Sequence, residues 1–223
     1  MKSTKKILLF LAAVVLVACT AAQADVIVLV TAPVGGNIVD WSSTGFAVNH
    51  QSHGFLGYST GGDTATATVS GGNSNKGQLV QQGTACPWCG NLNTGEYAIW
   101  TRSHGPLTVS FGNAYDFVGA YFQQDVFGSF TAKLDAYMGN TLLGSVTESG
   151  TSAFAPGTAL FIGARDLTGP NITKVVFSET AGNYLTNFAI GTMYAGVPEP
   201  GTLVLLGSGL LGLAGFARRR TAK

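Results

Sequence analysis

Charged side chains are scarce in this chain, and their scarcity argues against several kinds of partner. Only 10% of the 223 residues are Asp, Glu, Lys or Arg. Between two apolar ends, residues 25–196 hold five basic and ten acidic residues, which gives this segment a net charge of −5. Nucleic acids are bound through clustered Lys and Arg side chains. We therefore expect no nucleic-acid partner and no docking on an anionic membrane surface.

Sequence motifs that mark common enzyme classes are missing. The chain has no GxSxG nucleophile elbow, and Gly207-Ser208-Gly209 lies in an apolar run near its end. It also has no phosphate-binding GxxxxGKS/T loop and no HExxH metal motif. The sequence thus gives no positive evidence of catalysis, and we expect a protein that is not an enzyme.

The first residues predict export. Three lysines precede a short apolar stretch, residues 7–18, and Ala22-Gln23-Ala24 follows. A positive start, an apolar core and an Ala-x-Ala site are typical of a secretory signal peptide, here a signal helix over residues 1–24. We expect export by the Sec route and a cut after Ala24. Residues 16–19 also resemble a lipoprotein signal, so a lipidated Cys19 stays open as an alternative.

Cysteine is rare, and only one pair is closely spaced. Cys86 and Cys89 flank Pro87-Trp88, and the loop residues 91–95 follow. A redox dithiol requires a strand-to-helix turn, and a zinc knuckle requires a second pair of ligands; neither pattern is present. Export leads to an oxidising compartment. We therefore predict a Cys86–Cys89 disulfide in a small loop that exposes Trp88, with metal binding and redox work as alternatives.

Histidines and aspartates offer weaker signals. The histidines could join the cysteine pair around a metal. The aspartates could supply a glycosidase acid and nucleophile or ligate Ca²⁺. No DxDxDG-type calcium loop is present, so we expect neither metal nor cofactor, with calcium left open. The residues concerned are His50, His53, His104, Asp116, Asp125, Asp135 and Asp166.

The middle of the chain predicts an all-β domain over residues 25–196. Residues 64–69 and 130–137 alternate apolar and polar side chains, as strands with one buried face do. Gly139-Asn140 is a tight hairpin turn into residues 142–146. Strand candidates recur roughly every 10 to 12 residues, with turns between them and no helical period. This spacing favours an antiparallel β-sandwich or jelly roll.

The final residues, 197–223, combine three features. Pro198-Glu199-Pro200 is held extended by its prolines and precedes an apolar run, residues 203–217. That run is shorter than the roughly 20 residues of an ordinary transmembrane helix, but it is uncharged and rich in glycine. Arg218-Arg219-Arg220 would keep the following end in the cytoplasm. Taken alone, these features predict a short anchor with a single transmembrane helix.

The order of these features closely resembles the PEP-CTERM sorting signal of Gram-negative bacteria that produce exopolysaccharide. The resemblance covers about residues 197–220. It implies that a membrane-embedded exosortase is a partner, that it recognises Pro198, Glu199 and Pro200, and that the helix and basic end are removed. It further implies an inner-membrane intermediate, followed by the cell surface or extracellular matrix.

Residues 107–195 resemble, less closely, the cargo domains that precede such tails. The resembling pieces include residues 116–122, 134–137 and 172–177. Such cargo often places an acidic residue after its last isoleucine, whereas Gly191 follows Ile190 here. The resemblance implies a lectin-like or carbohydrate-binding-module-like sandwich.

Aromatic side chains matter if the ligand is a sugar, because a pyranose ring stacks on Trp or Tyr. Trp41, Trp88, Trp100 and Tyr121 are available, and we expect Trp88 and then Trp41 to be the exposed platforms. The expected function is that of a non-enzymatic exported protein associated with exopolysaccharide or biofilm, and able to bind carbohydrate. A polysaccharide-degrading enzyme on a β-sandwich and a purely structural or adhesive surface protein are the alternatives.

Overall fold

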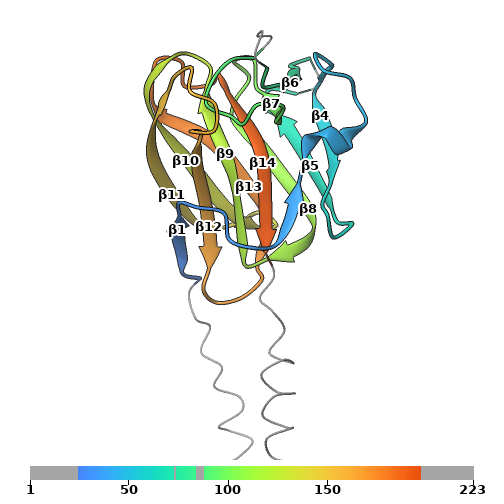
Figure 1. The fold of residues 1–223 in the computed structure, drawn as a ribbon. Coiled ribbons are helices and arrows are strands. Elements are labelled where there is room, and N and C mark those ends of the chain that lie inside the picture. Colours follow the sequence, from blue (N-terminus) through green and yellow to red (C-terminus); the bar gives the residue numbers. More distant parts are fainter. Residues whose placement is uncertain (1–24, 73, 84–87, 197–223) are drawn as a thin grey trace, which may run out of the picture.

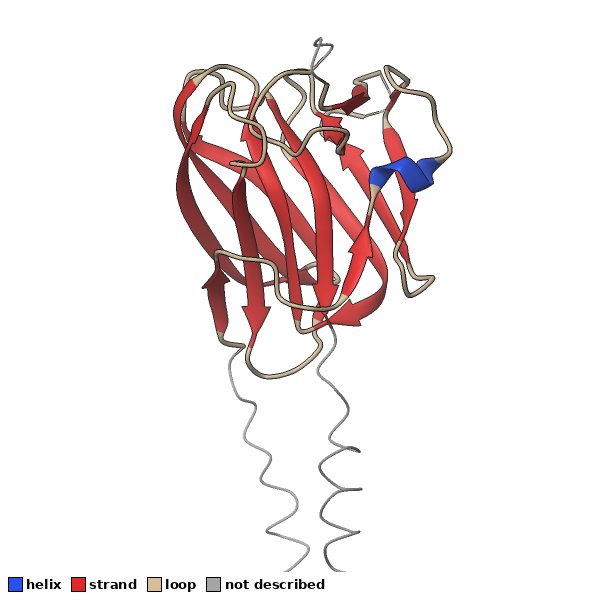
Figure 2. Ribbon diagram, viewed as in Figure 1, coloured by secondary structure: helices blue, strands red, loops and turns tan. Residues whose placement is uncertain are grey.

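The structure is a computed structural model that describes residues 25–72, 74–83 and 88–196. Within these residues the secondary structure is β-strand joined by loops, apart from one short 3-10 helix (Figure 2). In chain order the elements are β1 (Ile27–Val30), β2 (Asn37–Val39), η1 (Trp41–Thr44), β3 (Gln51–Ser52), β4 (Gly54–Tyr58), β5 (Thr64–Val69), β6 (Gly77–Gln81), β7 (Tyr97–Trp100), β8 (Leu107–Tyr115), β9 (Phe117–Gln124), β10 (Gly128–Met138), β11 (Thr141–Ser152), β12 (Leu160–Asp166), β13 (Ile172–Ala181) and β14 (Phe188–Gly196).

The described strands form two antiparallel sheets that pack face to face (Figure 1). The eight-stranded sheet has the order β1-β12-β9-β14-β7-β6-β3, with β2 paired to β14. The six-stranded sheet has the order β11-β10-β13-β8-β5-β4. The predicted all-β, antiparallel class is confirmed, whereas the jelly-roll subclass stays a prediction.

Side-chain alternation explains why these segments are strands. In β5, Ala65, Ala67 and Val69 are buried and the intervening threonines face outward. β10 and β11 form the predicted hairpin, which turns at Gly139 with a left-handed φ of 58°. A glycine adopts this conformation without the steric cost that a Cβ would add.

The core lies between the sheets and draws side chains from both. Phe55, Leu107, Leu134 and Phe177 come from the six-stranded sheet and meet residues such as Phe122 of the eight-stranded sheet. All are fully buried. Each such side chain contributes about 1.5–3 kcal/mol through the hydrophobic effect. The described residues therefore form a two-layer arrangement with this core between the sheets, whereas the domain bounds 25–196 stay a prediction.

A second, smaller cluster covers the outer face of the eight-stranded sheet. Trp88 and Leu92 come from the long connection between β6 and β7, and they pack onto Val80, Ala98 and Ala189. These three small or branched side chains project outward from β6, β7 and β14. The connection is therefore folded back onto the sheet and shields part of its outer surface.

Both ends of the described chain lie at one end of the sandwich (Figure 1). The Asp116 amide donates to the Gly196 carbonyl, and the Asp166 amide donates to the Asp116 carbonyl, at 3.0 and 2.7 Å. The Thr168 hydroxyl, just after β12, donates to Asp25 at 2.9 Å. Residues 1–24 and 197–223, with the predicted signal and transmembrane helices, lie outside the described residues. No helix in the described part is long and apolar enough to cross a membrane.

Candidate functional site

The two tryptophans expected to stack on sugar are both buried. Trp88 is only 4% exposed because its loop folds back, bridges to Gln82 and places its ring 5.5 Å from that of Trp100. Trp41 is fully buried, and its indole Nε1 donates to the carbonyl of Gly191 at 2.8 Å. The expected exposure of both side chains is wrong, so neither offers a free ring face for stacking.

The predicted disulfide cannot be compared with the structure, whereas the surroundings of two of the histidines can. Cys86 lies outside the described residues, so the disulfide with Cys89 stays a prediction. Around the histidines, the ring of His50 stacks on Phe46 at 3.9 Å, and His53 Nδ1 lies 3.2 Å from the Asn75 carbonyl. Throughout the described ranges, no group of three or more His, Cys, Asp or Glu side chains is placed to hold a metal ion.

The four aspartates considered for catalysis or calcium lie in different parts of the fold. Asp116 and Asp166 are neighbours at the end that holds Asp25 and Gly196. Burial raises the pKa of Asp116, and the charge of Arg165, with Nε 3.8 Å from Asp116 Oδ2, opposes that rise.

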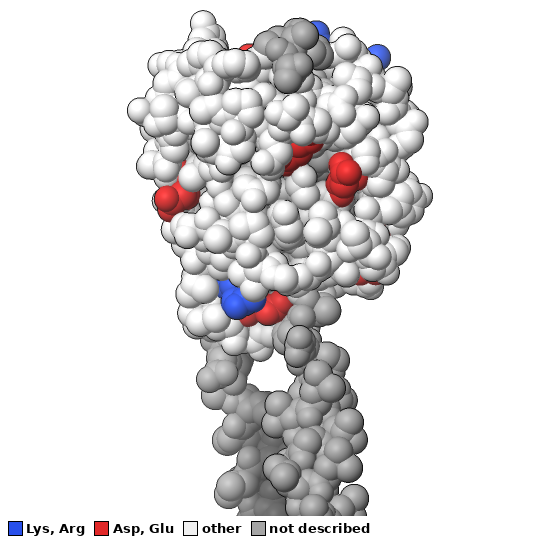
Figure 3. Space-filling model, viewed as in Figure 1, with Lys and Arg blue, Asp and Glu red and all other residues white. Residues whose placement is uncertain are grey.

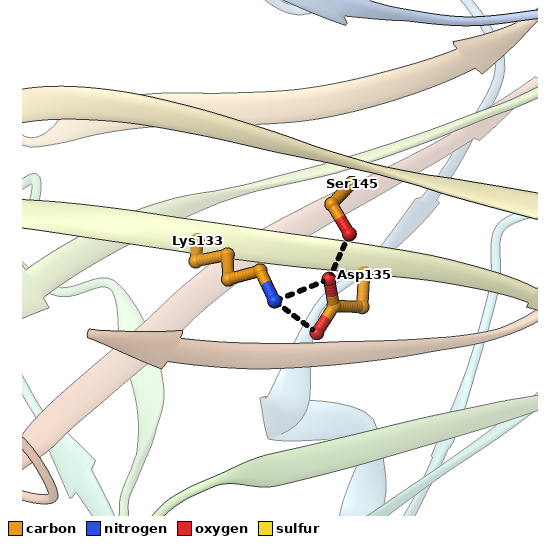
Figure 4. A network of polar contacts seen from close by, with 3 residues as sticks. All are labelled: Lys133, Asp135 and Ser145. Atoms are coloured by element: carbon orange, nitrogen blue, oxygen red, sulfur yellow. Dashed lines mark hydrogen bonds and ion pairs between the residues drawn. The ribbon is translucent and has the colours of Figure 1, made fainter. Parts of the chain in front are cut away.

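Asp125 lies at the opposite end, where it accepts a 2.6 Å hydrogen bond from Asn187 Nδ2. Burial raises the pKa of Asp125, and the bond from Asn187 partly lowers it. Asp135 lies on the outer face of the six-stranded sheet in an ion pair with Lys133 (Figure 4). The four carboxylates are thus divided between the two ends and one face.

Buried amides hold the β6–β7 connection against the sheet. Gln123 Oε1 accepts from the backbone amides of Asn91 and Leu92 at 2.8 and 3.2 Å. Gln82 Nε2 donates to the Gly90 carbonyl at 3.2 Å. Gln82 and Gln123 are each 1% exposed, so water competes little for these bonds.

Glu96 fixes the end of the same connection. Its Oε1 accepts from the Thr192 amide at 2.7 Å, and its Oε2 accepts from the Asn93 amide at 2.9 Å. A Cβ at Gly191 would lie only 2.4 Å from Glu96 Oε1. Glycine at 191 therefore leaves the space in which the Glu96 carboxylate sits.

Next to this connection, four aromatic side chains form a continuous cluster on the outer face of the eight-stranded sheet. The ring of Phe161 lies 5.4 Å from Tyr121 and 5.9 Å from Tyr194, in both cases edge to face. Tyr121 and Tyr194 are 6.2 Å apart, and Phe117 stacks on Phe161 at 6.3 Å. We call the two half-exposed residues, Tyr121 and Tyr194, the tyrosine surface.

Glycines create the space beneath these rings. A Cβ at Gly119 would lie 2.6 Å from the ring of Phe161, and a Cβ at Gly163 would lie 2.8 Å from Phe117. The phenylalanines can therefore lie against the backbone, where they are buried. The tyrosines stand at the solvent side of this aromatic layer.

The tyrosine surface is neutral. Burial, and then the neighbouring Tyr121 and Glu96, raise the pKa of Tyr194 above its ordinary value of 10, so its hydroxyl stays protonated at neutral pH. Figure 3, which looks onto the eight-stranded sheet, shows few charged side chains on this face. Neutral aromatic rings with hydroxyl groups suit the apolar face and hydroxyls of a sugar better than they suit an ionic ligand.

Sequence reasoning included Tyr121 but missed Tyr194 and Phe161. Both lie in strongly apolar strands, where an aromatic residue is usually core. The available signal was the repeat Phe117, Gly119, Tyr121, which places a glycine between two aromatics on one strand face.

Comparison with known proteins identifies a sequence motif near the C-terminal end of the chain. No curated protein matches it significantly. Residues 196–220 match the PEP-CTERM protein-sorting motif. This range contains Pro198, Glu199 and Pro200, which lie outside the described residues. The motif indicates secretion and membrane-associated sorting by an exosortase to the cell surface. The chain thus carries a PEP-CTERM protein-sorting motif, which begins at Gly196, the last residue of β14.

Proposed function

We propose that this exported surface protein is a non-enzymatic component of the extracellular matrix that binds exopolysaccharide through the tyrosine surface. The observation that carries the proposal is the half-exposed pair of Tyr121 and Tyr194 on a weakly charged sheet face. Aromatic rings of this kind stack on sugar rings while their hydroxyls exchange hydrogen bonds. A lectin-like role for the sandwich fits the same observation.

The arrangement of acids favours binding over hydrolysis. Glycosidases hold two carboxyl groups about 5–9.5 Å apart across the scissile bond. Near the tyrosine surface, the charge of Glu96 helps to raise the pKa of Tyr194, and the two oxygens of Glu96 accept bonds from Thr192 and Asn93. A single, fully engaged carboxylate supports a positioning role for Glu96.

The test is co-sedimentation of the exported protein with exopolysaccharide from its own host. We expect the Tyr121→Ala/Tyr194→Ala variant to lose at least tenfold in binding, because both stacking faces disappear. Tyr58→Ala is the matched control, since Tyr58 is an exposed tyrosine on β4 of the other sheet. Equal binding by all three proteins would contradict the tyrosine surface.

The two alternatives give different readouts in the same experiment. A purely structural or adhesive protein that does not bind the polysaccharide would stay in the supernatant at every polysaccharide concentration. A degrading enzyme would release new reducing ends with time, and substitution of one carboxylate would stop that release. We expect sedimentation without new reducing ends.

A further inference from the structure

A second feature lies on the six-stranded sheet, on the opposite side of the molecule from the tyrosine surface. A pocket of about 340 Å³ opens over the outer face where β10, β11 and β13 meet. Its volume is within the range of small-molecule sites. We call it the hydroxyl pocket, and it is lined by Ser129, Phe130, Thr131, Ser149, Gly150, Thr151 and Ala181.

Four hydroxyl groups define the chemistry of this pocket. Thr131 and Ser149 are register partners across β10 and β11, and their oxygens lie 3.1 Å apart. Ser129 and Thr151 form the next outward pair. Each hydroxyl has one donor and two acceptor positions, so the contact between Thr131 and Ser149 leaves capacity for a ligand. No charged side chain lines the pocket.

A β-bulge helps to form the hollow. Thr131 pairs with Ala181, whereas the next residue, Ala132, pairs with Glu179, so Thr180 is the extra residue of β13. Bulges bend a strand and redirect its side chains. Ala181 and Gly150 add little side-chain volume. The outer face of the sheet is therefore hollowed at this point, where the outward-facing side chains are small serines and threonines.

Exposed aromatics lie just beyond the strand ends that line the pocket. Phe127 precedes Ser129 by two residues, and Phe154 and Tyr184 follow Thr151 and Ala181 by three residues each. Their side chains are 51%, 58% and 59% exposed. Asn183 Nδ2 donates a hydrogen bond to the Phe127 carbonyl at 3.4 Å, so the loop that carries Phe127 contacts the loop that carries Tyr184.

The ion pair below the pocket leaves this part of the face neutral. Lys133 Nζ contacts both oxygens of Asp135, at 2.9 and 3.0 Å, and Ser145 donates to the same carboxylate (Figure 4). Lys133 is the outward residue that follows Thr131 on β10. The charges cancel next to the pocket, which disfavours a polyanion or a polycation as the ligand.

From these observations we propose that the hydroxyl pocket binds one or two residues of a neutral sugar, with the exposed aromatics beyond the adjoining strand ends stacking on the ligand. The four hydroxyls match a ligand with many hydroxyls and no charge. The small volume suits the end of a glycan or a short side branch. This site stands apart from the tyrosine surface and does not depend on it.

The test is titration of the exported protein with glucose, galactose, mannose, cellobiose, lactose and maltose, followed by calorimetry and saturation-transfer NMR. Glucuronate is the acidic comparison. We expect at least one neutral sugar to bind, and the Thr131→Val/Ser149→Ala variant to bind it at least tenfold more weakly. The variant removes two hydroxyls with little change in shape.

The matched control is Thr66→Val/Ser110→Ala. Thr66 and Ser110 are also register partners with exposed side chains, on β5 and β8 of the same sheet, away from the pocket. We expect this control to bind as the unchanged protein does. Tyr184→Ala should weaken binding, and Tyr58→Ala should not.

Three results would overturn the proposal: no binding of any neutral sugar at saturating concentrations, preference for glucuronate, or equal binding by the pocket variant and its control. The polysaccharide sedimentation described above separates the two sites. A failed pocket leaves sedimentation through Tyr121 and Tyr194 intact, whereas a failed tyrosine surface leaves the sugar titration unchanged.

Discussion

Glu179 is the least expected side chain in the core. It follows Val175 and Phe177 on the inward face of β13 and is 7% exposed. Neither of its carboxylate oxygens has a hydrogen-bond partner in the described structure. Burial raises the pKa of Glu179 to about 8, from an ordinary value of 4.5. The folded protein therefore holds this carboxyl group protonated at pH 7.

This burial predicts a pH dependence of stability. Between pH 4.5 and 8 the unfolded chain has lost the proton of Glu179, whereas the folded protein retains it. Folding then takes up a proton, so the free energy of unfolding falls as pH rises through this window and levels off above it. The loss at pH 7 is on the order of 3 kcal/mol.

Urea unfolding at pH 5, 6.5 and 8 measures this contribution. Glu179→Gln should flatten the decline, because glutamine does not titrate, and its advantage over the unchanged protein should grow with pH. Ser178→Ala, one residue away on the outward face, should keep the original slope. Parallel curves for Glu179→Gln and the unchanged protein would contradict the prediction.

Sequence reasoning missed both Glu179 and the burial of Trp88, for physical reasons. The alternation along β13 places position 179 inward, but a charged residue at that position is more typical of the end of a strand. We expected Trp88 to be exposed because a short loop closed by a predicted disulfide has no hydrophobic core of its own. Its partners, Trp100 and Ala189, come from β7 and β14, which local pattern cannot bring together.

At the scale of elements, the positions of the strands were more predictable than the pairing between them. Residues 64–69 and 130–137 were expected as strands, and the structure contains them as β5 and within β10. Alternation and turns define a strand and its faces. The pairing of β1 with β12, or of β2 with β14, joins segments far apart in the chain, and no local signal encodes it.

The β6–β7 connection yields a prediction at this scale. Glu96→Gln weakens the charge-assisted bonds that join it to Thr192 and Asn93, and charged acceptors contribute about 1.5–3 kcal/mol. We expect faster amide exchange and proteolysis within residues 88–96, with little change in the core strands. Hydrogen exchange with mass spectrometry measures both regions.

Gln81→Glu is a suitable control for Glu96→Gln, because Gln81 is a half-buried residue of β6 whose amide donates to the Gly95 carbonyl of the same connection. Loss of that single neutral bond should give a smaller effect. If both variants exchange as slowly as the unchanged protein, Glu96 does not fix the connection.

At the scale of the whole molecule, both ends of the described chain lie at one end of the sandwich (Figure 1). The predicted signal peptide and the sorting motif therefore adjoin the same end of the domain in sequence. The hydroxyl pocket lies toward the other end, because the start of β10 and the ends of β11 and β13 line it. This placement leaves the loops that carry Phe127, Phe154 and Tyr184 on the side away from the sorting signal.

Processing at both ends is testable by intact mass. Protein recovered from the surface or medium of its host should begin at Asp25, end near Glu199 and gain two hydrogens on thiol reduction if Cys86 and Cys89 are joined. A mass that retains residues 218–223 would indicate a plain anchor. A lipid-sized excess on Cys19 would indicate a lipoprotein.

The position of β14 has a mechanical consequence. This strand leads directly into the sorting motif, and it is bonded to β9 on one side and to β7 and β2 on the other. Tension applied at Gly196 acts along the strand axis, so the hydrogen bonds on both sides bear the load in shear and at the same time. A cell-surface protein pulled by a moving fluid would then transmit force through the middle of its sheet. An edge strand in the same position would instead lose its hydrogen bonds one after another.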